Sequence, residues 1–161
     1  MTDSPLTLTG SPLAVRDDHY CFGCGQLNPY GLRLRFFLNE DGGVSAPWTP
    51  VREHEGFTGI SHGGIITTVL DEVMGWALYQ RDIWAVTGRL NVSFRKPVEI
   101  GDPTVATAWI TSDSGRKLDL TAEVRRQSDG LLLAEATAVF VRVSDERAAE
   151  WKARYAARAS Q

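Results

Sequence analysis

The chain has 161 residues, of which 43% are hydrophobic and 23% charged, with a formal net charge of -3. This composition is that of one globular domain and excludes a disordered or fibrous chain. The 17 basic residues do not exceed the 20 acidic ones, so a nucleic acid partner is not expected. No apolar run is long enough to span a membrane and no signal peptide is visible, so we expect a cytoplasmic protein without a membrane partner.

Residues 1–20 show little periodicity, and we predict an N-terminal arm outside the core. Two cysteines follow, Cys21 and Cys24, too few and too close together for a secreted disulfide scaffold. With His19 nearby they form half of a zinc knuckle, but a four-ligand structural site needs a second pair of ligands. We therefore expect no metal, and we interpret the cysteines as small, partly buried residues in a tight loop.

Two short strands are predicted next. Apolar and polar residues alternate over residues 31–37, the period of two of a half-buried strand. A second strand is predicted over residues 44–48, where Pro47 and Pro50 would confine it to a sheet edge.

A long helix is predicted from about His62 to Gln80, with Ser61 as its N-cap. It is apolar on nearly every side and therefore belongs in a core. Its only Asp, Glu, Lys or Arg residues are Asp71 and Glu72, which lie about 100° apart around the axis and cannot share one buried face. We expect at least one to face the core or an interface, with Asp71 as the buried functional carboxylate; the alternative is a solvated helix edge.

Four strands are predicted after the helix, at residues 85–96, 104–112, 117–127 and 131–143. Their connections are too short for parallel crossovers, so the strands are expected to be antiparallel neighbours. Residues 144–161 are predicted as a polar helical tail. The whole pattern predicts an α+β fold, with a single domain over residues 21–143 made of one antiparallel sheet and one buried helix.

The start of the helix is the first candidate for chemistry. Gly63 and Gly64 leave backbone N–H groups unobstructed where the helix dipole favours negative charge, which predicts an oxyanion pocket. Asp71 lies eight residues beyond Gly63, roughly 12 Å along a helix, so one carbonyl cannot contact both. If both act on the same atom, Asp71 comes from a second subunit, and we expect a homodimer with composite sites.

Several segments together resemble one family: Cys21-Phe22-Gly23-Cys24-Gly25, Asn28-Pro29-Tyr30-Gly31-Leu32, Gly59-Ile60-Ser61-His62-Gly63-Gly64 with Asp71, and residues 87–98. This pattern resembles the hot-dog-fold acyl-CoA thioesterases of the 4-hydroxybenzoyl-CoA and phenylacetate-pathway type, over about residues 21–143. The resemblance implies a curved antiparallel sheet wrapped around one long central helix, in homodimers that often pair into homotetramers. It also implies hydrolysis of an acyl-CoA substrate to free acid and CoA, without a cofactor.

The resemblance also implies roles for individual residues. The Gly63 N–H would bind the thioester oxygen, Asp71 would be the general base or nucleophile, and Thr87 would orient water. His62 is expected to cap or orient the turn, and a part in catalysis is the alternative. Many relatives carry Asn or Gln where this chain has Gly56, so that contact with the thioester is missing. The residues expected to bind the substrate are Gly64, Gly88, Arg89, Arg95 and Lys117.

Two alternatives to hydrolysis are a hot-dog hydratase or dehydratase and a non-catalytic acyl-CoA sensor. A hot-dog hydratase or dehydratase would place a His shortly after Asp71, and residues 73–78 contain none. A non-catalytic acyl-CoA sensor would be expected to lose the carboxylate or to carry a pair of DNA-binding helices, and the sequence indicates neither. A Ser-His-Asp hydrolase is excluded because no His follows Ser61 except the adjacent His62.

Overall fold

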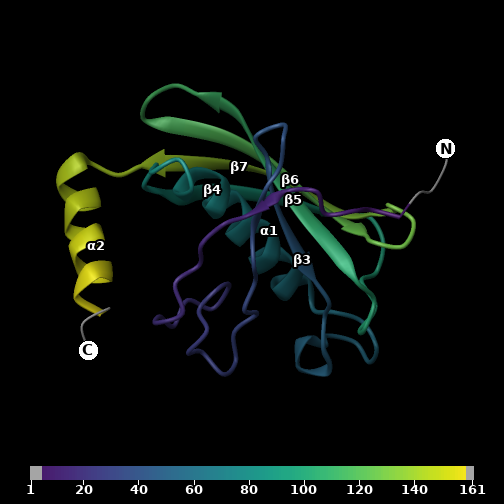
Figure 1. Ribbon diagram of the computed structural model, residues 1–161. Helices are drawn as coiled ribbons and strands as arrows, with labels where there is room; N and C mark the ends of the chain where they lie inside the picture. Colours follow the sequence, from purple (N-terminus) through teal and green to yellow (C-terminus); the bar gives the residue numbers. More distant parts are fainter. Residues whose placement is uncertain (1–4, 159–161) are drawn as a thin grey trace.

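An antiparallel sheet wraps around one long helix in the computed structural model, which describes residues 5–158 (Figure 1). The strands are β1 (Ser11–Pro12), β2 (Phe37–Leu38), β3 (Val44–Trp48), β4 (Ala85–Phe94), β5 (Thr104–Asp113), β6 (Lys117–Arg126) and β7 (Leu132–Arg142). They lie in the order β1-β2-β3-β5-β6-β7-β4. The helices are the 3-10 turn η1 (Arg52–His54), α1 (Gly63–Tyr79) and α2 (Asp145–Arg158). The predicted α+β class is confirmed.

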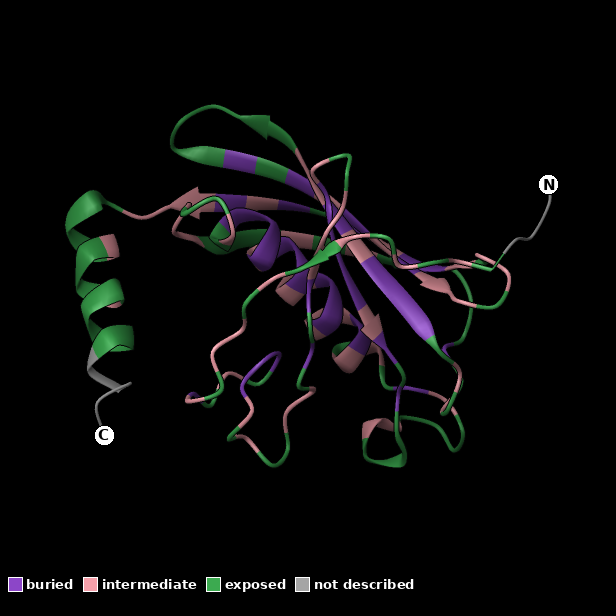
Figure 2. Cartoon of the chain, in the orientation of Figure 1, coloured by how far each residue is buried: buried purple, intermediate pink, exposed green. Residues whose placement is uncertain are grey.

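The core lies between α1 and the inner face of the sheet (Figure 2). On β6 every second residue is buried: Leu118, Leu120, Ala122 and Val124. Each fully buried Leu or Val stabilises the fold by about 1.5–3 kcal/mol. Phe36 adds a ring stacked on Trp76 of α1, with 4.5 Å between their centroids. The long helix and the four predicted strands are therefore confirmed, with ends within a few residues of the prediction.

The predicted strand over residues 31–37 is wrong except at its end, where Phe37 pairs with Ser45. Arg33 has a left-handed backbone with φ of 53°, which interrupts a regular strand. The residues around it instead bond to the cysteine loop, because Leu34 N donates to Gly23 O at 2.9 Å. The alternation thus reflects side chains such as Leu34 packing into the core, not a place in the sheet.

The described part of the N-terminal arm packs against the domain. Leu13 N donates to Phe36 O at 2.8 Å, and the side chains of Leu13 and Val15 pack against the core. The prediction that the arm lies outside the core is therefore wrong for its described part, because Leu13 and Val15 pack against that core. At the other end, α2 stands away from the sheet (Figure 1), and its Trp151 and Tyr155 rings lie near Trp84. No helix among residues 5–158 is both long and apolar enough to cross a membrane.

The predicted edge position of β3 is wrong, because β3 lies between β2 and β5. Pro47 is nevertheless tolerated, since β2 pairs only with Val44 and Ser45 and leaves no ladder on the outer side of Pro47. The long edge strand is β4, which pairs with β7 alone. Most of its residues are exposed, including Val86 and Phe94 at its two ends.

Candidate active site

His62, not Ser61, caps helix α1. The His62 backbone is extended, with φ of −63° and ψ of 135°, and its ring Nδ1 accepts a 2.9 Å hydrogen bond from Gly64 N. Ser61 is buried, and its N–H donates to Val98 O at 2.8 Å, so it is held away from the cap position. The expected capping role of His62 agrees with this geometry.

The two glycine N–H groups at the start of α1 have different partners. The Gly64 N–H is bonded to the His62 ring and is not available to a substrate in this conformation. The Gly63 N–H donates to no acceptor within residues 5–158. Of the two predicted donors, Gly63 is therefore the one positioned to bind an oxyanion at the positive end of the helix dipole.

Asp71 is bonded to Thr87 across the gap between α1 and β4. The Thr87 hydroxyl donates to Asp71 Oδ1 at 2.7 Å, which fixes the orientation of the carboxylate. The structure therefore brings these two predicted site residues together. The expectation that Asp71 is buried is wrong for a single chain: Asp71 is only half-buried and Thr87 is exposed. Both lie beside β4, whose outer side pairs with no strand of residues 5–158.

A β-bulge at Gly88 sets the direction of Thr87. Thr87 pairs with Phe140 and Arg89 with Val139, so Gly88 is an extra residue in β4. Such a bulge bends a strand and redirects the side chains next to it. A Cβ at Gly88 would lie 3.0 Å from Val141 Cγ2, so glycine fits closely against β7. Gly88 therefore shapes the backbone of the site.

The C-terminal end of β4, at Phe94, contacts the start of α1, at Gly63. A Cβ on Gly63 would lie 3.3 Å from Phe94 Cζ, so the Phe94 ring packs over the first residue of α1. Strand β4 thus lies beside Asp71 through Thr87 and beside Gly63 through Phe94. In one chain these two groups are separated by eight residues of helix, roughly 12 Å.

The predicted basic residues do not gather in one chain. Arg95 follows β4, and its Nε donates to Glu135 Oε1 at 2.9 Å. Lys117 pairs with Val141, toward the opposite end of β7 from Arg95. Arg89 pairs with Val139, two residues from Val141 on β7, and is exposed, with no ion-pair partner among residues 5–158. Of these three basic residues, only Arg89, in β4, and Arg95, directly after it, lie on the same strand as Thr87 and Phe94.

Gly56 packs directly against the start of the helix. Its N–H donates to Ile60 O at 2.9 Å, and a Cβ there would lie 3.1 Å from His62 Cα. An Asn or Gln side chain at this position would need the turn to move. The loop is closed instead by Glu55, whose Oε1 accepts from Gly59 N at 3.0 Å.

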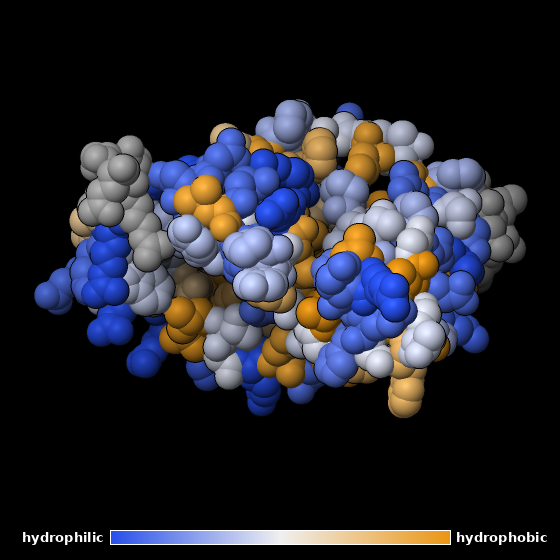
Figure 3. Space-filling model, turned by 90° about the horizontal axis from the view of Figure 1, so that it is seen from below, coloured by the Kyte–Doolittle hydropathy of each residue, from blue (hydrophilic) through white to orange (hydrophobic). Residues whose placement is uncertain are grey.

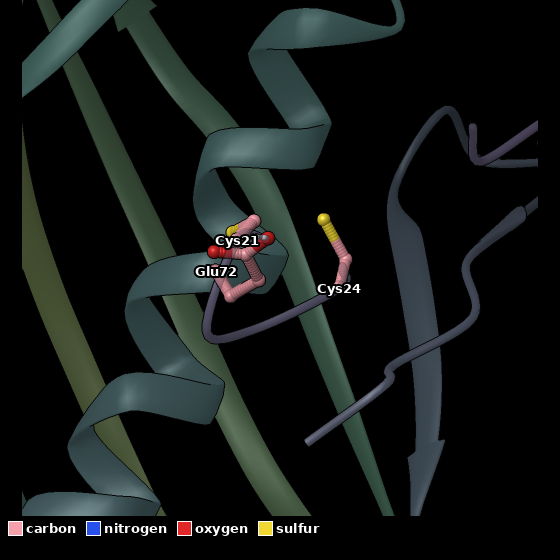
Figure 4. A group of neighbouring side chains, drawn as sticks. All are labelled: Cys21, Cys24 and Glu72. Atoms are coloured by element: carbon pink, nitrogen blue, oxygen red, sulfur yellow. Dashed lines mark hydrogen bonds between the residues drawn. The ribbon is translucent and has the colours of Figure 1, made fainter. Parts of the chain in front are cut away.

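Glu72, half-buried like Asp71, lies beside the two cysteines, a contact that the sequence pattern did not indicate. Cys21 Sγ lies within hydrogen-bond distance of Glu72 Oε1, at 3.4 Å, and Cys24 lies on the same loop (Figure 4). Burial, with the neighbouring Cys21, raises the pKa of Glu72 to about 7. The hydrogen bond from Cys24 lowers the pKa of Cys21, and the same contact raises the pKa of Cys24.

Comparison with known proteins gives related sequences over the middle of the chain. Residues 58–133 match the thioesterase superfamily. The acyl-coenzyme A thioesterases THEM4 of Mus musculus and Bos taurus are 29% and 30% identical to it over 93 residues, or 58% of this chain. These stretches cover 40% and 38% of the two relatives, so the chain spans about two fifths of their length.

Solved structures share the fold. A thioesterase superfamily protein superposes with a TM-score of 0.71 at 24% identity, covering 76% of this chain and 63% of that one. The protein smu.793 from Streptococcus mutans, bound to acetyl CoA, gives 0.64 at 22% identity, covering 69% and 89% of the two chains. The PaaI protein of E. coli, from the phenylacetic acid degradation operon, gives 0.65 at 18% identity, covering 70% and 81%. The chain therefore has the hot-dog fold of these structures, and its residues 58–133 match the thioesterase superfamily.

Proposed function

We propose that the chain hydrolyses acyl-CoA thioesters to the free acid and CoA, at a site shared by two copies of the chain. The observation that carries the proposal is the hydrogen bond from Thr87 of β4 to Asp71 of α1. The first N–H of the same helix, that of Gly63, has no acceptor among the described residues. Thioester hydrolysis needs these two elements, a carboxylate that activates the attack and a donor that stabilises the oxyanion. The acyl-coenzyme A thioesterases among its relatives support this reaction class.

The exposed β4 edge supports a twofold dimer. A ten-residue edge strand with exposed Val86 and Phe94 invites pairing with another strand. Antiparallel pairing of two β4 strands would set the beginning of one against the end of the other. Since Thr87 lies near the beginning and Phe94 at the end beside Gly63, Asp71 of one copy would approach Gly63 of its partner.

The chemistry needs no strong acid. In one route, Asp71 takes a proton from water as the water oxygen bonds to the thioester carbon, and the Gly63 N–H stabilises the oxyanion. The carbon–sulfur bond then breaks, and the CoA thiolate leaves and takes up the proton. In the other route, the Asp71 oxygen itself displaces the thiolate, and water hydrolyses the resulting anhydride. Thr87 orients the carboxylate in both routes.

A thiol-release assay over aliphatic and aromatic acyl-CoAs tests the proposal. The unmodified chain should release CoA from at least one of them, and Asp71→Asn should lower kcat by about 10²–10⁴-fold. Asp119→Asn, at an exposed carboxylate on the outer side of β6, is the matched control and should keep full activity. Saturable acyl-CoA binding without release from any substrate would contradict hydrolysis and indicate the sensor function.

A further inference from the structure

A second cluster of reactive side chains lies on another side of α1. The cluster consists of Cys21, Cys24 and Glu72, whose two sulfur atoms and one carboxylate oxygen lie within 4.8 Å of one another. Glu72 follows Asp71 directly, so it points about 100° away around the helix axis. Figure 4 shows both cysteines on the loop that passes this side of α1. The proposed hydrolysis uses none of the three residues.

We propose that Cys21, Cys24 and Glu72 bind one zinc ion through two thiolates and one carboxylate. In tetrahedral zinc sites the Zn–S distance is about 2.3 Å and the Zn–O distance about 2.1 Å, so sulfur and oxygen ligands lie about 3.6 Å apart. The 3.4 Å between Cys21 Sγ and Glu72 Oε1 is close to that value. Thiolates beside a carboxylate select zinc over magnesium or calcium, which prefer oxygen ligands alone.

The loop is shaped to bring the cysteines against the carboxylate. A Cβ on Gly23 would lie 2.4 Å from Glu72 Cδ, so a larger residue there would require the Glu72 side chain to shift. A Cβ on Gly25 would lie 2.4 Å from Cys21 N, and Gly25 N donates to Cys21 O at 2.8 Å. The two glycines therefore let the loop lie close against the helix at Glu72.

The cluster holds no positive side chain among the described residues. Arg16 lines the same cavity, but its Nε donates to Asp18 Oδ1 at 2.9 Å, and no Lys or Arg within residues 5–158 forms an ion pair with Glu72. A half-buried carboxylate beside two thiols is costly without a cation. A disulfide between the cysteines would leave the Glu72 carboxylate without a positively charged partner, whereas a divalent cation would be bound by all three groups.

A fourth coordination position would face a cavity of about 300 Å³ lined by His19, Trp76, Trp84 and Tyr155. His19 is buried, and its Nδ1 accepts from Cys21 N at 3.3 Å, so it orients the loop. It is not in the group whose ligand atoms all lie within 4.8 Å of one another. Three protein ligands and an open position are typical of zinc sites that bind water or a small ligand. This departs from the expectation of no metal, because the third ligand comes from α1, 51 residues after Cys21.

Metal titration of the full-length, reduced chain tests the site. After removal of metal with a chelator, Zn²⁺ in competition with a colorimetric chelator should bind at one ion per chain. Co²⁺ should give the intense near-ultraviolet charge-transfer band of thiolate ligands. Absence of that band, or no stoichiometric zinc, in the unmodified chain would overturn the proposal whether or not any variant folds.

Variants then identify the ligands. Cys21→Ser and Cys24→Ser should each weaken zinc binding by more than about 100-fold, and Glu72→Gln by at least about 10-fold, since even groups outside the coordination sphere contribute 10–100-fold. Asp71→Asn is the matched control on the neighbouring residue. It should bind zinc as the unmodified chain does, although it lacks hydrolase activity under the proposed function. Unchanged zinc affinity in Glu72→Gln would overturn the three-ligand site.

Discussion

The Thr87 hydroxyl donates to Asp71 Oδ1 at 2.7 Å and thereby connects edge strand β4 to the central helix. A hydrogen bond to a charged group contributes about 1.5–3 kcal/mol, so Thr87→Val should lower kcat by about 10–100-fold if the bond orients the catalytic carboxylate. Thr87→Ser keeps the hydroxyl and should retain most activity. Steady-state kinetics of both variants measure this, and equal kcat values for Val and Thr would show that the bond plays no part in turnover.

Gly63→Pro isolates the proposed oxyanion donor. Proline lacks the N–H, yet it is favoured at the first position of a helix, and the extended His62 backbone suits a residue before proline. Loss of one oxyanion donor lowers kcat by about 10²–10³-fold, and we expect that effect here. Gly63→Ala adds a Cβ against the same Phe94 ring but keeps the N–H, so it is the control. Similar losses in Ala and Pro would assign the effect to the Phe94 contact.

The open edge of β4 should carry the dimer. Val86→Lys puts a charge on this exposed edge, which disfavours strand pairing, and should shift the protein toward a less active monomer. Val51 is similarly exposed, 47% against 44% for Val86, but follows β3 at the other side of the sheet. Val51→Lys should therefore leave the mass unchanged in light scattering. Other apolar residues lie scattered over the face of the molecule that Figure 3 shows. If Val51→Lys caused the dimer to dissociate, the dimer would use an interface other than the β4 edge.

His62 should contribute to stability through its cap. His62→Ala removes the acceptor for Gly64 N and should lower the free energy of unfolding by about 1 kcal/mol. His62→Asn supplies another good capping acceptor and should recover most of that loss. Urea unfolding measures both, and thiol release from His62→Asn near the unmodified level would agree with a structural role. A fully stable His62→Ala would rule out the cap as a source of stability.

The parts of the fold that could be predicted are those with regular periodicity. Leu118, Leu120, Ala122 and Val124 alternate because β6 has one face on the core. Helix α1 is apolar on most of its sides because the sheet wraps around it. The same period misled over residues 31–37, since side chains can enter a core in alternation without a hydrogen-bond ladder beside them.

The candidate site was predictable only in part. The motif that begins at Gly63 indicated the helix and its acid, but the bulge at Gly88 that directs Thr87 has no periodic signal. Which of Ser61 and His62 caps the helix depends on the hydrogen bond from Ser61 N to Val98 O, which a local pattern does not indicate. Contact of Glu72 with Cys21 depends on the path of the N-terminal loop across α1, which local sequence does not specify.

Subunit complementation tests the shared site most directly. Asp71→Asn and Gly63→Pro chains are unfolded together, refolded as an equal mixture and assayed for thiol release. If Asp71 of one copy works with Gly63 of the other, half of the dimers are mixed and each has one intact site of two, so about a quarter of the unmodified activity should return. Activity no higher than that of either variant refolded alone would contradict the shared site.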